Sequence, residues 1–221
     1  MKINKNFTIA CLMFLLFSIL SLTAKDQNPV LFTGKGPENS DPNRSSLEGT
    51  IQIYGWSQDG KVFIEENSTY FANYRLIDLI TDKVLLSGEL FLEPESINKA
   101  FDAAKQKYGI KLKSGPIDYF PYTDKFSNEF SAALVNKGTN SYNIEIIKQD
   151  STGKKTKKVI SEIVIHVEAP AEIKDTRFIY VKSPYENRLL VVAAVPQWHI
   201  EFDYIYYNFF LAGCSLSSRF Q

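Results

Sequence analysis

The sequence predicts a mainly β protein, a single β-rich domain built from antiparallel hairpins with one amphipathic helix. Its composition favours a packed core, because 14% of the residues are aromatic and 44% are hydrophobic, whereas disordered chains are poor in both classes. After residue 50, short runs rich in β-branched and aromatic residues alternate with turn residues, which is typical of strands. One stretch carries the spacing of an amphipathic helix.

The N-terminal residues 1–24 predict a secretory signal peptide. Lys2 and Lys5 precede the apolar run 7–22, and the small residue Ala24 stands before the next charges, which is the order of segments that directs export. The run is shorter than the ~20 apolar residues of a membrane-spanning helix. We expect cleavage near Ala24, a periplasmic or extracellular mature protein, and no integral membrane span after cleavage. A retained N-terminal anchor is the alternative.

Residues 25–49 are rich in Pro, Gly and polar residues and predict a flexible linker, which leaves 50–221 as the β-rich domain. Within it, residues 110–125 contain Gly115, Pro116 and Pro121 and predict a loop. Strands are expected at 50–56, 61–66, 70–79, 83–92, 129–136, 141–149, 159–168, 177–182, 188–195 and 198–210.

The one predicted helix covers residues 94–108. Its apolar residues recur every three or four positions, with Phe101 near the middle of the stripe. Pro94 suits the first turn of a helix and Gly109 suits its end. We expect the helix to lie across the sheet with Phe101 as its anchor.

Charge and cysteine content exclude several classes of function. The 25 basic residues balance the 25 acidic ones, so no strong field would attract nucleic acid or an anionic membrane. Cys11 leaves with the signal peptide, and Cys214 alone remains, so the mature chain forms no internal disulfide. No phosphate-binding glycine motif occurs, and no cofactor is expected.

The stretch Ser57–Lys61, with the sequence SQDGK, has two interpretations. An Asp-Gly step between two apolar runs is a strong hairpin signal, because Gly60 accepts the positive φ of a tight turn and Asp59 can cap it. A nucleophilic Ser57 would instead need a base within hydrogen-bond reach. Only His166 and His199 are available, and both lie in strand-like runs, so the structural interpretation is favoured and no catalytic residue is assigned.

A related pattern, Ser183-Pro184 followed by a polar turn and Arg188, leads into the apolar strand 188–195. Both stretches resemble the S-P-D-G-K hairpin signature of TolB-like and other β-propeller blades. The two serines are 126 positions apart, but the intermediate blade registers carry no motif, so a complete propeller is not expected. The turn residues assigned are Ser57, Asp59, Gly60, Ser183 and Pro184.

The order of these motifs is also similar to a family of secreted bacterial proteins of unknown function. The matching features are the SxDG corner, the Leu76–Leu79 step that ends a strand, the helix, and the S-P-x-x-x-R strand. The resemblance implies export and a β-rich fold. It implies no activity and no catalytic residue.

Metal, thiol and carboxylate chemistry find little support in the sequence. His166 with Glu168 and His199 with Glu201 are isolated pairs, too few for a metal site. Cys214, expected near an exposed C-terminus, has no His or Lys beside it in sequence to activate it. Metal-binding, cofactor-binding and catalytic residues are therefore left unassigned.

The aromatic residues carry the functional hypothesis, which is a non-catalytic binding or envelope-assembly module with an envelope protein or glycan as its partner. A carboxylate-dependent hydrolase or carbohydrate-active enzyme, using Asp78, Glu201 or Asp203, is the alternative. The aromatics of 198–210 alternate between both faces of the expected strand, which fits burial on both sides or one partner-binding face. The candidate contact residues are Tyr119, Phe120, Tyr122, Trp198, Tyr204 and Tyr206.

Overall fold

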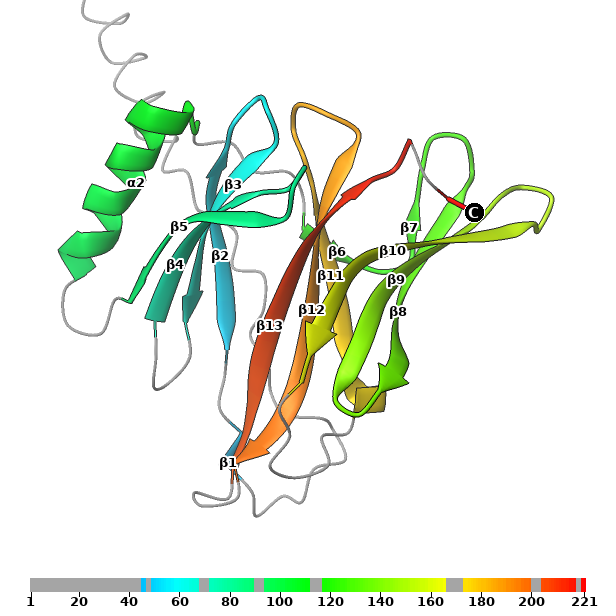
Figure 1. Cartoon of the computed structure of the whole chain (residues 1–221). Helices are drawn as coiled ribbons and strands as arrows, with labels where there is room; N and C mark the ends of the chain where they lie inside the picture. Colours follow the sequence, from blue (N-terminus) through cyan, green and yellow to red (C-terminus); the bar gives the residue numbers. More distant parts are fainter. Residues whose placement is uncertain are drawn as a thin grey trace, which may run out of the picture.

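The computed structural model of the chain confirms a mainly β fold (Figure 1). It describes residues 45–46, 49–67, 72–89, 94–111, 117–165, 173–199, 204–217 and 220–221. Within these residues the strands form three open sheets, and no closed propeller is present. We call them the N-terminal sheet (β2-β3-β4-β5), the central sheet (β1-β13-β12-β11-β6) and the lateral sheet (β10-β9-β8-β7).

The N-terminal sheet is a meander of four antiparallel strands. They are β2 (Thr50–Trp56), β3 (Lys61–Asn67), β4 (Ala72–Asp78) and β5 (Lys83–Glu89). Alternation along β3 and β4 separates two apolar faces. On β3, Val62 and Ile64 face the central sheet, whereas Phe63 faces the opposite way, toward the helix.

The helix α2 (Pro94–Tyr108) has the predicted bounds and covers the outer face of the N-terminal sheet (Figure 1). Its stripe packs Phe101 against Tyr54 and Phe63, and both pairs of ring centroids lie 5.3 Å apart. The helix ends at Tyr108, just before the predicted stop residue Gly109, whose φ of 65° is the left-handed conformation that glycine adopts without strain.

The central sheet is buried on both faces. Its strands are β1 (Ser45–Ser46), β6 (Ile117–Tyr119), β11 (Arg177–Lys182), β12 (Arg188–His199) and β13 (Tyr204–Ser215). Along β12, Leu190, Val192 and Ala194 face the N-terminal sheet, and the residues between them face the lateral sheet. The almost uninterrupted apolar run of β12 follows from this position, because a strand with a layer on each side needs apolar residues at every position.

The lateral sheet packs on the far side of the central sheet (Figure 1). Its strands are β7 (Tyr122–Thr123), β8 (Glu129–Gly138), β9 (Ser141–Gln149) and β10 (Lys155–Val164). The short helix η1 (Ile173–Asp175) then leads into β11. Phe130 and Ile146 fill the space between the two sheets.

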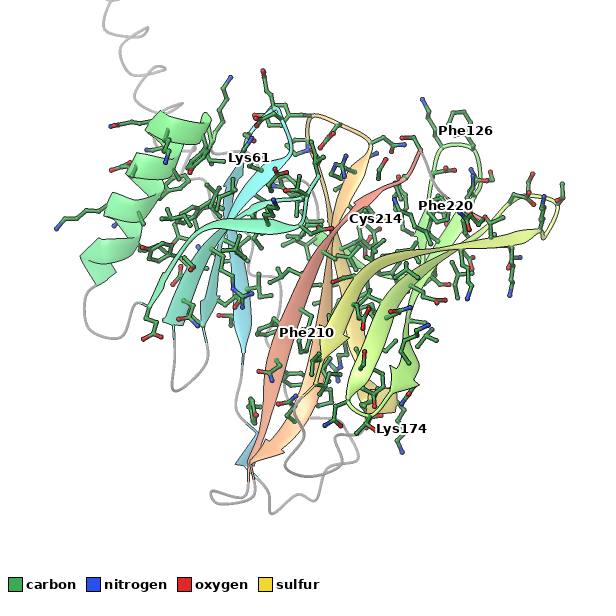
Figure 2. The ribbon with its side chains drawn as sticks, viewed as in Figure 1. Lys61, Phe126, Lys174, Phe210, Cys214 and Phe220 are labelled. Carbon is green, nitrogen blue, oxygen red and sulfur yellow. The ribbon has the colours of Figure 1, made fainter. Side chains whose placement is uncertain are left out.

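Four expectations need correction. Residues 110–125 are not simply a loop, because they contain β6, which pairs with β11, and β7, which pairs with β8. Residues 198–210 are not one strand, because β12 ends at His199 and β13 begins at Tyr204. The expected linker holds β1, which pairs in parallel with β13. Cys214 is fully buried on β13 rather than lying near an exposed end of the chain (Figure 2).

Candidate functional site

The SQDGK corner is the turn between β2 and β3, and its side chains bond to one another. Ser57 is only 2% exposed. Its hydroxyl donates to the Asp59 carboxylate (2.5 Å) and accepts from the Lys61 amide (2.9 Å). The Asp59 carboxylate also pairs with the Lys61 ammonium. Gly60 has a φ of 84°, the left-handed conformation that this turn requires.

Electrostatics at this corner do not favour a nucleophilic serine. The hydrogen bond from Lys61 and then the one from Ser57 hold the pKa of Asp59 below its usual range, so the carboxylate is a weak base. The Ser57 hydroxyl is engaged by the turn itself. In chemical terms, the arrangement closes a hairpin and does not generate an alkoxide.

The second corner, between β11 and β12, has a comparable set of bonds. The Ser183 amide donates to the Arg188 carbonyl (2.9 Å), and the Ser183 hydroxyl accepts from the Tyr185 amide (3.3 Å). The Arg188 side chain donates to Glu186 at 2.9 Å. Pro184 lies between Ser183 and Tyr185 in the same turn.

The two corners meet, although they are far apart in the sequence. A Cβ on Gly60 would lie 2.9 Å from Glu186 Oε1, so the first turn lies directly against the second. The Arg188 guanidinium also donates to the Leu79 carbonyl (3.0 Å), in the β4–β5 turn. These contacts connect the upper ends of the N-terminal and central sheets.

The β4–β5 turn adds another contact between the same two sheets. Asp82 accepts a 2.7 Å hydrogen bond from the Gly213 amide on β13. Burial raises the pKa of Asp82. A Cβ on Gly213 would lie 2.0 Å from the Leu79 carbonyl oxygen, so only glycine allows the turn to approach β13 this closely.

The β6–β7 corner brings Tyr119, Phe120 and Tyr122 together but gives them different surroundings. The Tyr119 side chain points outward and is 53% exposed. Phe120 and Tyr122 are partly buried and pack edge-on against Tyr180, with ring centroids 5.1 and 5.2 Å away. Two of the three candidate contact rings therefore also anchor this corner to the core between the central and lateral sheets.

Charged groups lie beside these rings. The Tyr180 hydroxyl donates to Asp118 at 3.4 Å, and burial together with that carboxylate raises the Tyr180 pKa to about 12. The Lys182 ammonium lies 6.0 Å from the Tyr122 ring centroid. On the next turn, Phe126 is 69% exposed at the loop between β7 and β8 (Figure 2). Exposed aromatic rings beside hydrogen-bonding groups are typical of recognition surfaces.

The other candidate contacts, Trp198, Tyr204 and Tyr206, lie where β12 ends and β13 begins. The Tyr206 hydroxyl and the Asn208 amide both donate to Gln197 Oε1, each at 2.7 Å. Trp198 and Tyr204 are strand residues, paired with Ile205 and His199, but their side chains lie outside the described residues. Tyr206 therefore belongs to a polar network on the face of the central sheet that carries the second core cluster.

The described residues do not bring together the carboxylates that the alternative hydrolase function would use. Asp78 accepts from the Ile80 amide at 2.9 Å and caps the β4–β5 turn, whereas Glu201, Asp203 and His166 lie outside the described residues. Among the described residues, no three His, Cys, Asp or Glu side chains gather closely enough to hold a metal ion. Burial raises the pKa of the Cys214 thiol to about 11, which lowers its thiolate fraction.

Sequence reasoning missed two features of these sites. It did not detect that the two turn motifs touch, because they are separated by 126 positions and nothing local reports a contact between different sheets. It also missed the exposed Phe126. The run Phe126-Ser127-Asn128 is a turn-type composition around one aromatic residue, and this was the available signal.

Comparisons with protein-family models, curated proteins and solved structures give no match to this chain. No helix in the described part of the chain has the length and apolar character needed to cross a membrane. Its function is therefore inferred from the arrangement of its own residues.

Proposed function

We propose that this protein is an exported, non-catalytic binding protein of the cell envelope, and that the β6–β7 corner contributes to its contact surface. The observation that carries the proposal is the exposed Tyr119 ring on a corner anchored by Phe120 and Tyr122. A ring held in this way loses little conformational entropy when a partner covers it. The Ser57 hydroxyl, engaged within its own turn, supports a non-catalytic role.

An envelope protein or a cell-wall glycan would fit such a surface. A tyrosine offers an apolar face for a sugar ring or an apolar side chain, and its hydroxyl remains free to reach a polar group. Asp118, next to Tyr119, is exposed and adds a hydrogen-bond acceptor. Loops and corners on a rigid scaffold are where binding residues concentrate.

Replacing Tyr119 by Ala is expected to weaken binding at least tenfold, with little change in the melting temperature. Binding would be measured by co-sedimentation with purified cell-wall glycan and, separately, by site-specific photocrosslinking at residue 119 in intact cells. Glycan binding identifies one class of partner, and a crosslinked envelope protein identifies the other.

A matched control is Val84→Ala on β5, where the side chain is 51% exposed on a different sheet. This variant should bind like the wild type. Equal binding by the Tyr119→Ala and wild-type proteins in both assays would contradict the proposed contact surface.

A further inference from the structure

Within the described residues, one edge of the lateral sheet is largely unpaired. β8 pairs along its length with β9 on one side, but on the other side β7 covers only Glu129 and Phe130. In the described part of the chain, no strand pairs with Ser131–Gly138 at this edge. Figure 1 shows β8 at the outer margin of the molecule. The residues from Ser131 to Val135 are all partly exposed.

The hydrogen-bonding groups at this edge can be assigned from the adjoining turns. In an antiparallel pair, backbone bonds join alternate opposite residues. The Asp124 amide donates to the Asn128 carbonyl, so the even-numbered residues of β8 bond toward the β7 side. The turn between β9 and β10 gives the same assignment. There the Asp150 amide donates to the Lys154 carbonyl, so the even-numbered residues of β9 bond to β10 and the odd-numbered ones bond to β8. Ala132, Leu134 and Asn136 therefore present their N–H and C=O groups to the unpaired edge.

Two other edge strands, β10 and β5, carry features that oppose strand pairing, and β8 does not. β10 has Lys155 and Lys157 along its edge, and Gln221 pairs with Lys157 through two backbone bonds of 2.8 and 3.0 Å. β5 is interrupted by a register shift opposite Leu76 and Ile77. From Phe130 to Asn136, β8 has no charged residue, no proline and no register shift. Such an edge is a template for another strand.

We propose that β8 pairs antiparallel with β8 of a second copy of this chain, about a two-fold axis at Leu134, which joins the two lateral sheets into one. In this register Ala132 lies opposite Asn136 of the other copy, and Leu134 lies opposite itself. Ala132, Leu134 and Asn136 of each copy then each donate one backbone hydrogen bond to the other copy and accept one from it, which gives six hydrogen bonds in total. The pairing ends at Ser131, because β7 covers the edge from Phe130 onward.

A second copy fits this edge because the segment is complementary to itself. The axis places Ser131 opposite Lys137 and Ala133 opposite Val135, so no charge faces a like charge. Moving the axis to Ala133 would require Phe130 to bond to the second copy, but β7 already pairs there. Shifting the two strands by an odd number of residues would put each side chain on the wrong face of the sheet. Among the remaining registers, only the one centred on Leu134 pairs the whole segment 131–137 with the same segment of the second copy.

The pairing can be tested by substituting side chains of β8 on the outer face of the lateral sheet. Phe130, Ala132 and Leu134 pack into the second core cluster, so the alternate residues Ala133 and Val135 point away from it. Both are partly exposed, and substitutions there should not disturb the core.

Sedimentation velocity over a series of concentrations tests the proposal on the mature protein. The wild type should be a dimer that dissociates on dilution. The double variants A133K/V135K and A133E/V135E should each be monomers, because every introduced charge faces a like charge in the other copy. Mixed in equal amounts, they should form a one-to-one heterodimer. A monomeric wild type at every concentration, a dimeric double variant, or a mixture that does not associate would overturn the proposal.

Val164→Lys is the control, since Val164 is 51% exposed on the same sheet but belongs to β10. It should dimerise like the wild type, and its dissociation would overturn the assignment to β8. If the double variants fail to unfold cooperatively, an A133C chain is mixed with a V135C chain. Oxidation must then link the two chains in the mixture and leave each alone unlinked, because residue 133 faces 135 and not itself. Cys214 is buried and does not interfere.

Discussion

At the scale of single residues, Glu66 is the most unusual ionisable group that the structure describes. It is 2% exposed, on the face of the N-terminal sheet that meets the central sheet, and pairs with Arg75 through one carboxylate oxygen. Its other oxygen and the Oδ1 of Asn73, the opposite residue on β4, are buried acceptors without a donor. A proton on Glu66 would supply that donor.

The pKa of Glu66 is raised, because loss of hydration outweighs the attraction of Arg75. The folded protein therefore holds a proton on Glu66 over a pH range in which the unfolded chain has released it. By linkage, stability falls as pH rises from the ordinary glutamate pKa of about 4.3 to the raised folded value. Asp59 and Asp124 have lowered pKa values and act in the opposite direction.

Glu66→Gln is expected to remove this pH dependence, because the amide is always neutral and can donate to Asn73. The wild type should lose stability relative to the variant as pH rises through that range. Urea unfolding of both proteins across the range measures the difference, and the contributions of Asp59 and Asp124 cancel in it. A difference that stays constant, or changes in favour of the wild type, would show that Arg75 and not burial controls Glu66.

At the scale of elements, α2 shows how a sequence pattern becomes a packed layer. Phe101 is 6% exposed and lies among Tyr54, Phe63 and the other residues of the third core cluster. The outer face of the N-terminal sheet would otherwise expose these rings. The helix is therefore held mainly by burial of its apolar stripe, since isolated helices of this length are marginal in water.

Phe101→Ala should lower the free energy of unfolding by about 3–5 kcal/mol, through lost burial and the cavity left between helix and sheet. Denaturant unfolding measures this loss. Lys99→Ala, on the exposed side of the same helix, should change stability by less than about 0.5 kcal/mol. Similar effects for the two variants would show that the helix does not depend on this anchor.

The β6–β7 corner is an element whose two roles can now be separated. Removing Phe120 or Tyr122 would disturb the packing around Tyr180, so a loss of binding in those variants would not identify a contact. Tyr119 is the informative position because its exposed ring is the one that can be removed at little cost to the core.

At the scale of the whole molecule, the layers run helix, N-terminal sheet, central sheet and lateral sheet (Figure 1). Each apolar face of the central sheet is covered by a neighbouring sheet. The described strands thus form a packed body without a disulfide, and its one described cysteine is buried.

Export is the prediction that concerns the whole chain. N-terminal sequencing of protein recovered from the periplasmic or extracellular fraction should find a start just after Ala24, because the small residue there suits signal-peptide cleavage. Substituting a charged residue within the apolar run 7–22 should keep the full-length chain in the cytoplasm. An intact Met1 on the wild-type protein in the exported fraction would contradict cleavage.

The sequence by itself determined the local elements. Alternation, helical spacing and turn residues correctly predicted the bounds of β2, β9, β11 and α2, because these signals depend on neighbours within a few positions. They also predicted a hairpin at Asp59-Gly60, where the left-handed φ favours glycine. The pairing of β6 with β11 and the contact between the two turns had no comparable signal.

Tertiary structure decided which faces are covered and which remain open. The aromatic run from Trp198 onward was expected to be one strand, since no Gly or Pro interrupts it, but β12 and β13 divide it. Periodicity can show that a strand has two apolar faces, but not what lies against them. The layers around the central sheet, the exposure of Tyr119 and the unpaired edge of β8 all follow from contacts between distant segments, which the pattern within any one segment does not contain.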